Sequence, residues 1–89
     1  MDKYADKLKP MYDAIPAHVK KAATYCCDFN FPLTAEAMVT TVIAESLRKS
    51  GYEAPTAIEI GGYVWDYFVA EYDKSKALAK TETTRVSLH

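Results

Sequence analysis

The sequence predicts an all-α fold, a small compact bundle of three main helices preceded by a short N-terminal helix. Apolar side chains recur at steps of three and four residues through most of the chain, which is the period of helices with one buried face. Start and stop residues bracket the two clearest stretches, 34–50 and 56–74. The 89 residues suffice for one domain, and a hydrophobic content of 49% excludes general disorder.

The N-terminal third of the chain has apolar residues at alternating steps of four and three. They are Tyr4, Leu8, Met11, Ile15, Val19, Ala22, Cys26 and Phe29. We expect Pro10 to end or kink a first helix over about residues 2–10. Pro16 is compatible with the first turn of a second helix over 14–28 if Asp13 is its N-cap, because first-turn N–H groups have no partner within a helix.

A third helix is predicted over 35–50, with Thr34 as its N-cap and Gly51 at the left-handed position that follows a helix end. The β-branched run 38–43 is also compatible with a strand. The cap, the glycine stop and the length between them favour a helix. The short connection to the next helix makes the two antiparallel or steeply crossed neighbours.

The fourth helix, 56–74, begins with Thr56 and Glu59 at the spacing of a capping box. Its apolar arc is about twice the ~100° typical of a surface helix. The members of this arc are Ile58, Ile60, Gly61, Gly62, Val64, Trp65, Tyr67, Phe68, Val69 and Tyr72. Such a helix is either sandwiched within its own chain or shared with a second chain, and we expect a homo-oligomer, most simply a homodimer, with Trp65 in the core or the interface.

Two adjacent glycines, Gly61 and Gly62, lie inside this helix, where each costs about 1 kcal/mol relative to alanine. They indicate a bend, a helix that begins near Gly62, or a close approach of another helix or ring. We favour close approach because both glycines lie on the apolar arc. Beyond residue 80 the helical pattern is weak, so the prediction is one helical domain over 1–80 and a flexible tail over 81–89.

The charge distribution restricts the possible partners. The net charge of −1 does not suit a protein whose main task is to neutralise phosphates. Residues 34–73 contain seven acidic and two basic side chains, a net charge of −5, whereas residues 74–89 contain four basic and one acidic, a net charge of +3. An acidic body with a basic end allows electrostatic contact with a partner but does not identify one.

The cysteines and the N-terminus predict a cytoplasmic location. Cys26 and Cys27 are adjacent and cannot join distant parts of the chain, which fits free thiols in a reducing compartment. The N-terminal residues are charged and lack the apolar core of a signal peptide. No apolar run reaches the ~20 residues that span a bilayer.

The polar side of helix 56–74 supplies the predicted partner-binding site: Glu59, Tyr63, Asp66 and Asp73. The three carboxylates are seven residues apart, about 10.5 Å along a helix, which is too far for a shared proton or for one metal ion. They form either a solvated face or an acidic ridge that meets a basic partner. Tyr63 is expected to be exposed among them as an aromatic anchor.

The sequence predicts neither an enzyme nor a cofactor or metal site. His18 lies eight residues before Cys26, roughly 12 Å along a helix, beyond the reach of a catalytic Cys–His pair. A zinc site needs four ligands, and the chain has no second cluster of Cys or His. No nucleophile elbow, phosphate-binding glycine loop or dinucleotide motif is present.

The favoured function is therefore a non-catalytic adaptor, regulator or inhibitor that occupies the surface of a partner protein. Seven Tyr, one Trp and three Phe exceed what a small helical core holds, so some are expected at the surface or an interface. Small size without catalytic groups is also expected of inhibitors encoded by phages and other mobile elements.

The alternative is a nucleic-acid-associated transcriptional regulator that uses a lysine-rich N-terminal segment and the basic tail. Its phosphate contacts would come from Lys3, Lys7, Lys9, Lys20 and Lys21. The stretches 34–50 and 56–74 have the outline of a helix–turn–helix pair. The N-terminal end of 56–74, however, lacks the Arg, Lys, Asn or Gln with which a recognition helix contacts bases. Nucleic acid is thus the less favoured partner.

Overall fold

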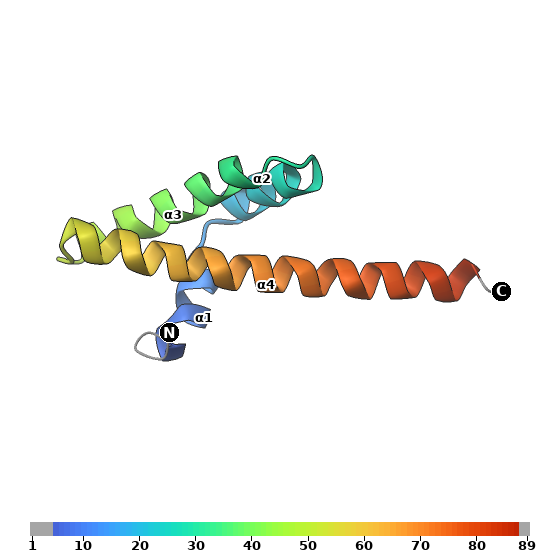
Figure 1. The fold of residues 1–89 in the computed structure, drawn as a ribbon. Coiled ribbons are helices and arrows are strands. Elements are labelled where there is room, and N and C mark those ends of the chain that lie inside the picture. The colour runs from blue at the N-terminus through green and yellow to red at the C-terminus, as the bar shows by residue number, and fades with distance from the viewer. Residues whose placement is uncertain (1–4, 88–89) are drawn as a thin grey trace.

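The structure is a computed structural model that describes the backbone of residues 5–87 and the side chains of residues 6–78. This part of the chain forms four helices and no strand, which confirms the all-α prediction (Figure 1). The helices are α1 (Ala5–Ala14), α2 (Ala17–Asp28), α3 (Pro32–Lys49) and α4 (Ala54–Ser87).

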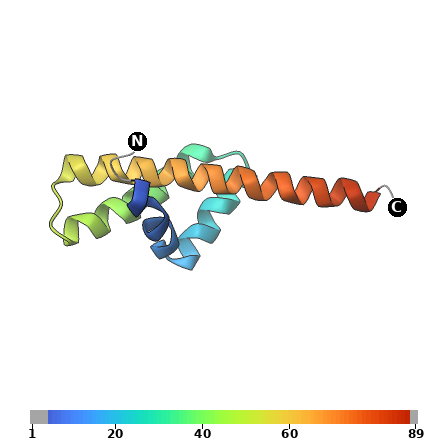
Figure 2. The ribbon, with the colours of Figure 1, turned by 90° about the horizontal axis from the view of Figure 1, so that it is seen from below.

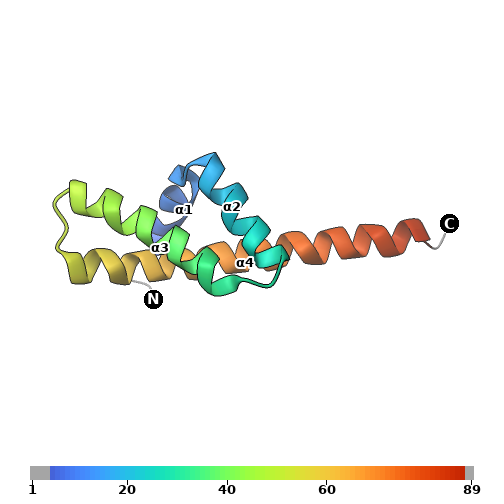
Figure 3. The ribbon, with the colours of Figure 1, turned by 90° about the horizontal axis from the view of Figure 1, so that it is seen from above.

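Helix α4 is the longest helix, and both α3 and α1 pack directly against it. Helix α3 runs back alongside it in the opposite direction, α2 packs on α3, and α1 crosses α4 (Figures 1 and 3). At 1.5 Å per residue, the 34 residues of α4 span about 51 Å, close to the 55 Å length of the whole molecule. The C-terminal part of α4 extends beyond the other three helices (Figure 2).

The core lies mainly between α3 and α4. Each of these helices presents one buried stripe at steps of three and four residues, as the sequence predicts. The buried apolar residues are Leu8, Ile15, Ala23, Ala35, Val39, Ile43, Leu47, Ala57, Ile60, Val64 and Phe68. The buried stripe of α4 is narrower than the predicted arc, because Ile58 is exposed and Trp65 and Val69 are only half-buried.

Gly61 is the point of closest approach between α3 and α4. A Cβ atom at Gly61 would lie 2.9 Å from the carbonyl oxygen of Thr40 and 3.1 Å from its Cγ2. A Cβ atom at Gly62 would meet nothing within 4 Å. Within the chain, the close-approach interpretation is thus confirmed for Gly61, whereas no atom of the chain approaches Gly62. The helix begins well before both glycines, at Ala54.

The first two helices differ from the prediction at their ends. Pro10 lies inside α1 and does not end it. Pro16 precedes α2, where its carbonyl accepts the N–H groups of Val19 and Lys20. Asp13 is not the predicted N-cap, because it belongs to the last turn of α1, where it accepts a hydrogen bond of 2.8 Å from Lys9.

The predicted caps of the third and fourth helices are also wrong. Phe31 is the N-cap of α3, and its carbonyl accepts the N–H of Ala35, so Thr34 lies within the helix. The Ala57 N–H donates to the carbonyl of Glu53 at 2.9 Å, so Thr56 lies within α4 and forms no capping box. A proline occupies the first turn of each helix, where its missing N–H has no intrahelical role and its fixed φ favours the helix.

Helices α2 and α3 end in the same way. After α2, the N–H groups of Asn30 and Phe31 donate to the carbonyls of Cys27 and Cys26, and Asn30 has a φ of 66°. This is the hydrogen-bond pattern of a Schellman motif. The same pattern follows α3, where Gly51 has a φ of 100°, which confirms the predicted role of this glycine.

The C-terminal end of α4 is longer than the sequence indicates, since the helix runs to Ser87. The side chains beyond residue 78 and the backbone of residues 88–89 lie outside the described part of the chain. The flexible tail over 81–89 and the domain limit at residue 80 stay predictions.

Candidate functional site

The predicted acidic stripe, Glu59, Asp66 and Asp73, is exposed on the side of α4 that faces away from the core. None of the ion pairs in the described part of the chain involves these three carboxylates. Tyr63 does not stand out among them: it is half-buried and packs against the core cluster, so the expectation of an exposed anchor is wrong. The physical reason is its position one turn from the buried Ile60.

A second surface, which the sequence did not predict, lies where α2 turns into α3. Four large apolar side chains are exposed there: Tyr25 by 53%, Phe29 by 71%, Phe31 by 61% and Leu33 by 79%. We call these four residues the aromatic corner. Phe29 fits the apolar period of the N-terminal stripe, yet the structure places it in solvent because α2 ends at Asp28.

The shape of the aromatic corner is set by its backbone. The Phe31 N–H donates to the Cys26 carbonyl at 2.6 Å and the Phe29 N–H to the Tyr25 carbonyl at 3.0 Å. Asn30 supplies the left-handed residue, and Pro32 starts α3 immediately after the turn. The Phe29 and Phe31 side chains are therefore not needed to close the turn, and they are presented by a preformed scaffold.

Asp28 joins the base of the aromatic corner to α4. It accepts a hydrogen bond of 2.6 Å from the Tyr72 hydroxyl and pairs with Lys76 at 2.7 Å. The hydrogen bonds from Lys76 and then Tyr72 lower the pKa of the Asp28 carboxyl. The same bond to Asp28, with a smaller effect of burial, raises the pKa of Tyr72 from its ordinary value of 10.0 to about 12.

This contact predicts a measurable titration. Because the folded pKa of Tyr72 exceeds the unfolded value, the contribution of its hydrogen bond to stability is present below pH 10 and is lost as the pH rises toward 12. Asp28→Asn should return the Tyr72 pKa toward 10, measured by NMR titration of 13C-labelled tyrosine rings. Asp13→Asn is the control, and a Tyr72 pKa that is unchanged in Asp28→Asn would contradict the contact.

The cysteines have the properties of packed thiols. Cys26 and Cys27 are both free and half-buried. Burial, then the neighbouring Cys26 and Asp28, raises the pKa of the Cys27 thiol, which disfavours the thiolate that a nucleophile or metal ligand requires. Within the described residues, no group of three or more His, Cys, Asp or Glu side chains could hold a metal ion.

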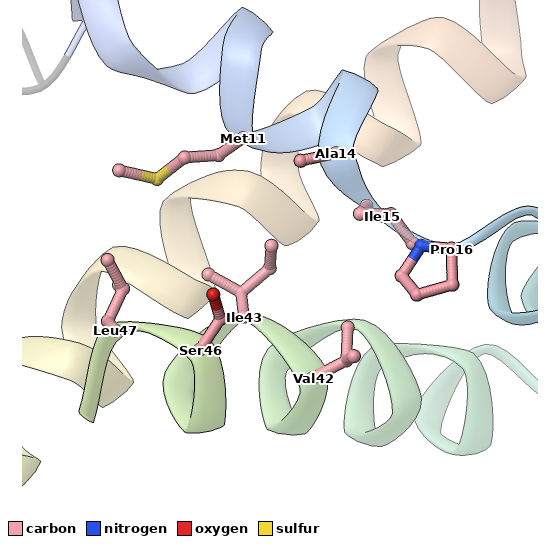
Figure 4. Close-up of a pocket in the computed structure, with 8 residues that line it drawn as sticks. All are labelled: Met11, Ala14, Ile15, Pro16, Val42, Ile43, Ser46 and Leu47. Atoms are coloured by element: carbon pink, nitrogen blue, oxygen red, sulfur yellow. The ribbon is translucent and has the colours of Figure 1, made fainter. Parts of the chain in front are cut away.

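A small apolar cavity separates the end of α1 from α3 (Figure 4). Its volume is about 200 Å³, below the ~300–1,000 Å³ typical of ligand pockets. Its lining consists of Met11, Ala14, Ile15, Pro16, Val42, Ile43, Ser46 and Leu47. The Ser46 hydroxyl is the one polar side-chain group among these residues, and none of them titrates, so the cavity offers no acid, base or charged ligand contact.

Comparisons of the chain with models of protein families, with curated proteins and with solved structures find no match. Among the residues described, no helix combines the length and apolar character needed to cross a membrane. The acidic stripe and the aromatic corner are therefore the exposed surfaces that indicate how the chain could act.

Proposed function

We propose that this chain is a non-catalytic cytoplasmic protein that acts by binding a partner protein, as an adaptor, regulator or inhibitor. The observation that supports this proposal is the aromatic corner. Aromatic side chains provide much of the binding energy at protein interfaces, and a rigid scaffold lowers the entropy lost on binding. The turn at Asn30 presents Phe29 and Phe31 in this way.

The size of the corner suits an interface. With ~200 Å² for each fully exposed aromatic ring, Tyr25, Phe29 and Phe31 present roughly 350 Å². This sum over the three rings is similar in size to the largest exposed apolar patches of monomeric proteins, ~300–600 Å², which are often functional. It is nearly half of the ~800 Å² that each partner buries in a standard interface. The corner therefore suits the apolar centre of a contact whose edges are polar.

The acidic stripe gives the proposal a second contact and a preferred kind of partner. Glu59, Asp66 and Asp73 are exposed and have no cation in the described ion pairs. A partner with a basic surface would gain from them chiefly in association rate, and this gain would fall with added salt. The proposed partner is thus a protein with an apolar pocket for the corner and a basic surface nearby.

The test is affinity capture from a cell lysate with identification by mass spectrometry. We expect Phe29→Ser with Phe31→Ser to lose at least ten-fold of the captured partner without lowering the melting temperature, because neither ring is needed for the turn. Leu78→Ser is the matched control, since Leu78 is 61% exposed on α4 outside the corner. Neutralising the stripe with Glu59→Gln, Asp66→Asn and Asp73→Asn should slow association more than it speeds dissociation.

Either of two results would overturn this proposal. One is a partner retained equally by the corner variant and the wild type, which would move the contact to another surface. The other is a set of captured proteins that the Leu78→Ser control loses as well, which would indicate non-specific apolar adsorption. Tyr63 is not part of this experiment, because its half-buried side chain packs against the core and its loss would also affect folding.

The lysines of the nucleic-acid alternative differ in their surroundings. Lys9 is paired with Asp13, and Lys20 lies 4.2 Å above the Tyr12 ring. Lys7 and Lys21 are exposed, and Lys3 lies outside the described residues. A fluorescence-anisotropy titration decides between the two functions. Duplex binding tighter than micromolar at about 150 mM salt would replace the proposal with the alternative.

A further inference from the structure

The contact between Asp28 and α4 bridges a gap in the packing of the fold. Helix α2 packs chiefly on α3, and the main neighbours of α4 are α3 and α1. A cavity of about 160 Å³ lies beside the contact, close to the end of α2. It is lined by Thr24 of α2, Tyr12 of α1 and a run of α4 residues: Phe68, Glu71, Tyr72, Ser75 and Lys76. At this place a cavity, and not close apolar packing, separates α2 from α4.

Three side chains join the two helices across this gap, and we call Asp28, Tyr72 and Lys76 the clamp. The Tyr72 hydroxyl and the Lys76 ammonium group both bind Oδ1 of Asp28, at 2.6 and 2.7 Å. The Lys76 nitrogen also lies 5.3 Å from the centre of the Tyr72 ring, within the range of a cation–π contact. Tyr72 and Lys76 are four residues apart on α4, so they reach the carboxylate from one face of the helix. Each member of the clamp thus contacts the other two.

The clamp acts where α2 meets the aromatic corner. Asp28 is the last residue of α2 and directly precedes Phe29. The corner spans two helices, with Tyr25 and Phe29 on the α2 side and Phe31 and Leu33 on the α3 side. The α3 side is held on α4 by the core, most of which lies between these two helices. The clamp provides the corresponding contact with α4 for the α2 side.

We propose that Asp28, Tyr72 and Lys76 are positioning residues for the aromatic corner, and that they hold its two sides in the arrangement that the partner binds. The inference rests on the proposed function and adds residues that act through the corner without touching the partner. An opening of the turn that moves Phe29 also displaces Asp28, so it breaks both polar contacts of the clamp. A corner held in this way loses less conformational entropy on binding, which raises affinity without a new contact.

The exposure of the clamp separates its effect on local order from its effect on global stability. The side chains of Lys76 and Asp28 are exposed by 52% and 30%. Exposed ion pairs contribute little to the free energy of unfolding of a whole domain. A turn at the end of a helix opens locally, at a lower free energy than the core, so a contact that it must break to open controls that opening. Loss of the clamp should therefore loosen the turn and leave the core between α3 and α4 intact.

Native-state hydrogen exchange measured by NMR tests the clamp without a partner. Tyr72→Phe with Lys76→Met removes both contacts with Asp28 and keeps the ring and the aliphatic stem. We expect the amides of Asn30 and Phe31, which close the turn, to exchange roughly three- to ten-fold faster in this variant, with a melting temperature close to that of the wild type. Equal exchange of these amides in the variant and the wild type would overturn the clamp.

Two further sets of variants distinguish positioning from a general loss of stability. Lys74→Met is the matched control, because Lys74 pairs with Glu71 at 3.2 Å within α4 and should leave exchange at the turn unchanged. Asp28→Lys and Lys76→Asp each break the ion pair, and the two together restore it with the charges reversed. The reversed pair should regain part of the slow exchange that each single variant loses. Exchange in the reversed pair as fast as in both single variants would contradict the clamp.

Partner capture connects the clamp to the proposed function. Tyr72→Phe with Lys76→Met should weaken binding of the captured partner several-fold. Asp28→Lys with Lys76→Asp should bind more tightly than either single variant, which a direct contact of Lys76 with the partner would not produce. A partner that binds the wild type and the clamp variant equally would overturn the positioning role and leave the proposed function intact. If Phe29→Ser with Phe31→Ser leaves capture unchanged, the proposed function itself fails.

Discussion

Gly61→Val should lower the free energy of unfolding by about 3 kcal/mol, at the upper end of the range for overpacked cores. The new Cβ would lie 2.9 Å from a backbone oxygen, the Thr40 carbonyl, which cannot rotate away as a side chain can. The two helices must separate instead, and α3 with α4 is the most extensive helix pair of the fold. For a domain of this size the melting temperature should fall by ~12–24 °C.

Gly62→Ala is the matched control because it changes the adjacent residue in the same helix. Its Cβ meets nothing within 4 Å, so the gain in helix propensity should raise the stability of the dilute protein by ~0.5–1 kcal/mol. Thermal melts followed by circular dichroism at low concentration compare the two. If Gly61→Val has the melting temperature of the wild type, then α3 and α4 do not approach closely at Thr40.

The different roles of the two glycines show the limit of helical periodicity as evidence. The period places both Gly61 and Gly62 on the apolar side of α4, and it cannot tell which one faces a neighbour. That depends on where α3 packs, which the contact with Thr40 determines. The existence of the helices was predictable from the period, and the stop at Gly51 from its freedom at positive φ.

The helix starts were predicted less well, for a common reason. The sequence indicates Asp13, Thr34 and Thr56 as caps, because their side chains can accept a hydrogen bond from the first turn. In the structure a proline marks each start instead: Pro16 precedes α2, Pro32 begins α3, and Pro55 follows the first residue of α4. Proline removes an N–H that would need a cap, so it competes directly with capping side chains.

The candidate site was predictable in part. The acidic stripe followed from the seven-residue spacing of Glu59, Asp66 and Asp73, because a fixed period along one helix is visible in the sequence. The burial of Tyr63 was not visible, because it depends on how α4 packs with the other helices. Contacts between helices are equally hidden in the sequence. One example joins α1 to α4, where the ring centroids of Tyr12 and Tyr67 lie 5.1 Å apart.

The sequence does not predict the aromatic corner, because the apolar period of the N-terminal stripe continues to Phe29, one residue beyond the end of α2. The Schellman motif at Asn30 ends α2, and Phe29 then leaves the face that Cys26 occupies. A signal was nevertheless present in the sequence, since Phe29 and Phe31 flank an asparagine and precede a proline. Asparagine tolerates the left-handed conformation and proline starts helices, so this pattern indicates a turn with aromatic residues at its surface.

Phe68→Ala should be the most damaging truncation in α4, with a loss of about 3–5 kcal/mol. Phe68 is buried, its ring stacks on Trp65 at a centroid distance of 5.5 Å, and it lies 6.2 Å from the ring of Tyr12. Its removal would leave a cavity where α1 crosses α4. Urea denaturation followed by circular dichroism gives the free energy of unfolding of each variant.

Trp65→Ala tests whether the stability lost on truncating an aromatic side chain depends on its burial or on its size. The sequence places the single tryptophan in the core or an interface, and full burial would make its removal cost as much as that of Phe68. Because Trp65 is only half-buried in one copy, we expect its truncation to cost about half as much when the protein is dilute. Equal losses in dilute protein would show that Trp65 belongs to the core of a single chain. A smaller loss would show that the indole stabilises this core only through its buried part.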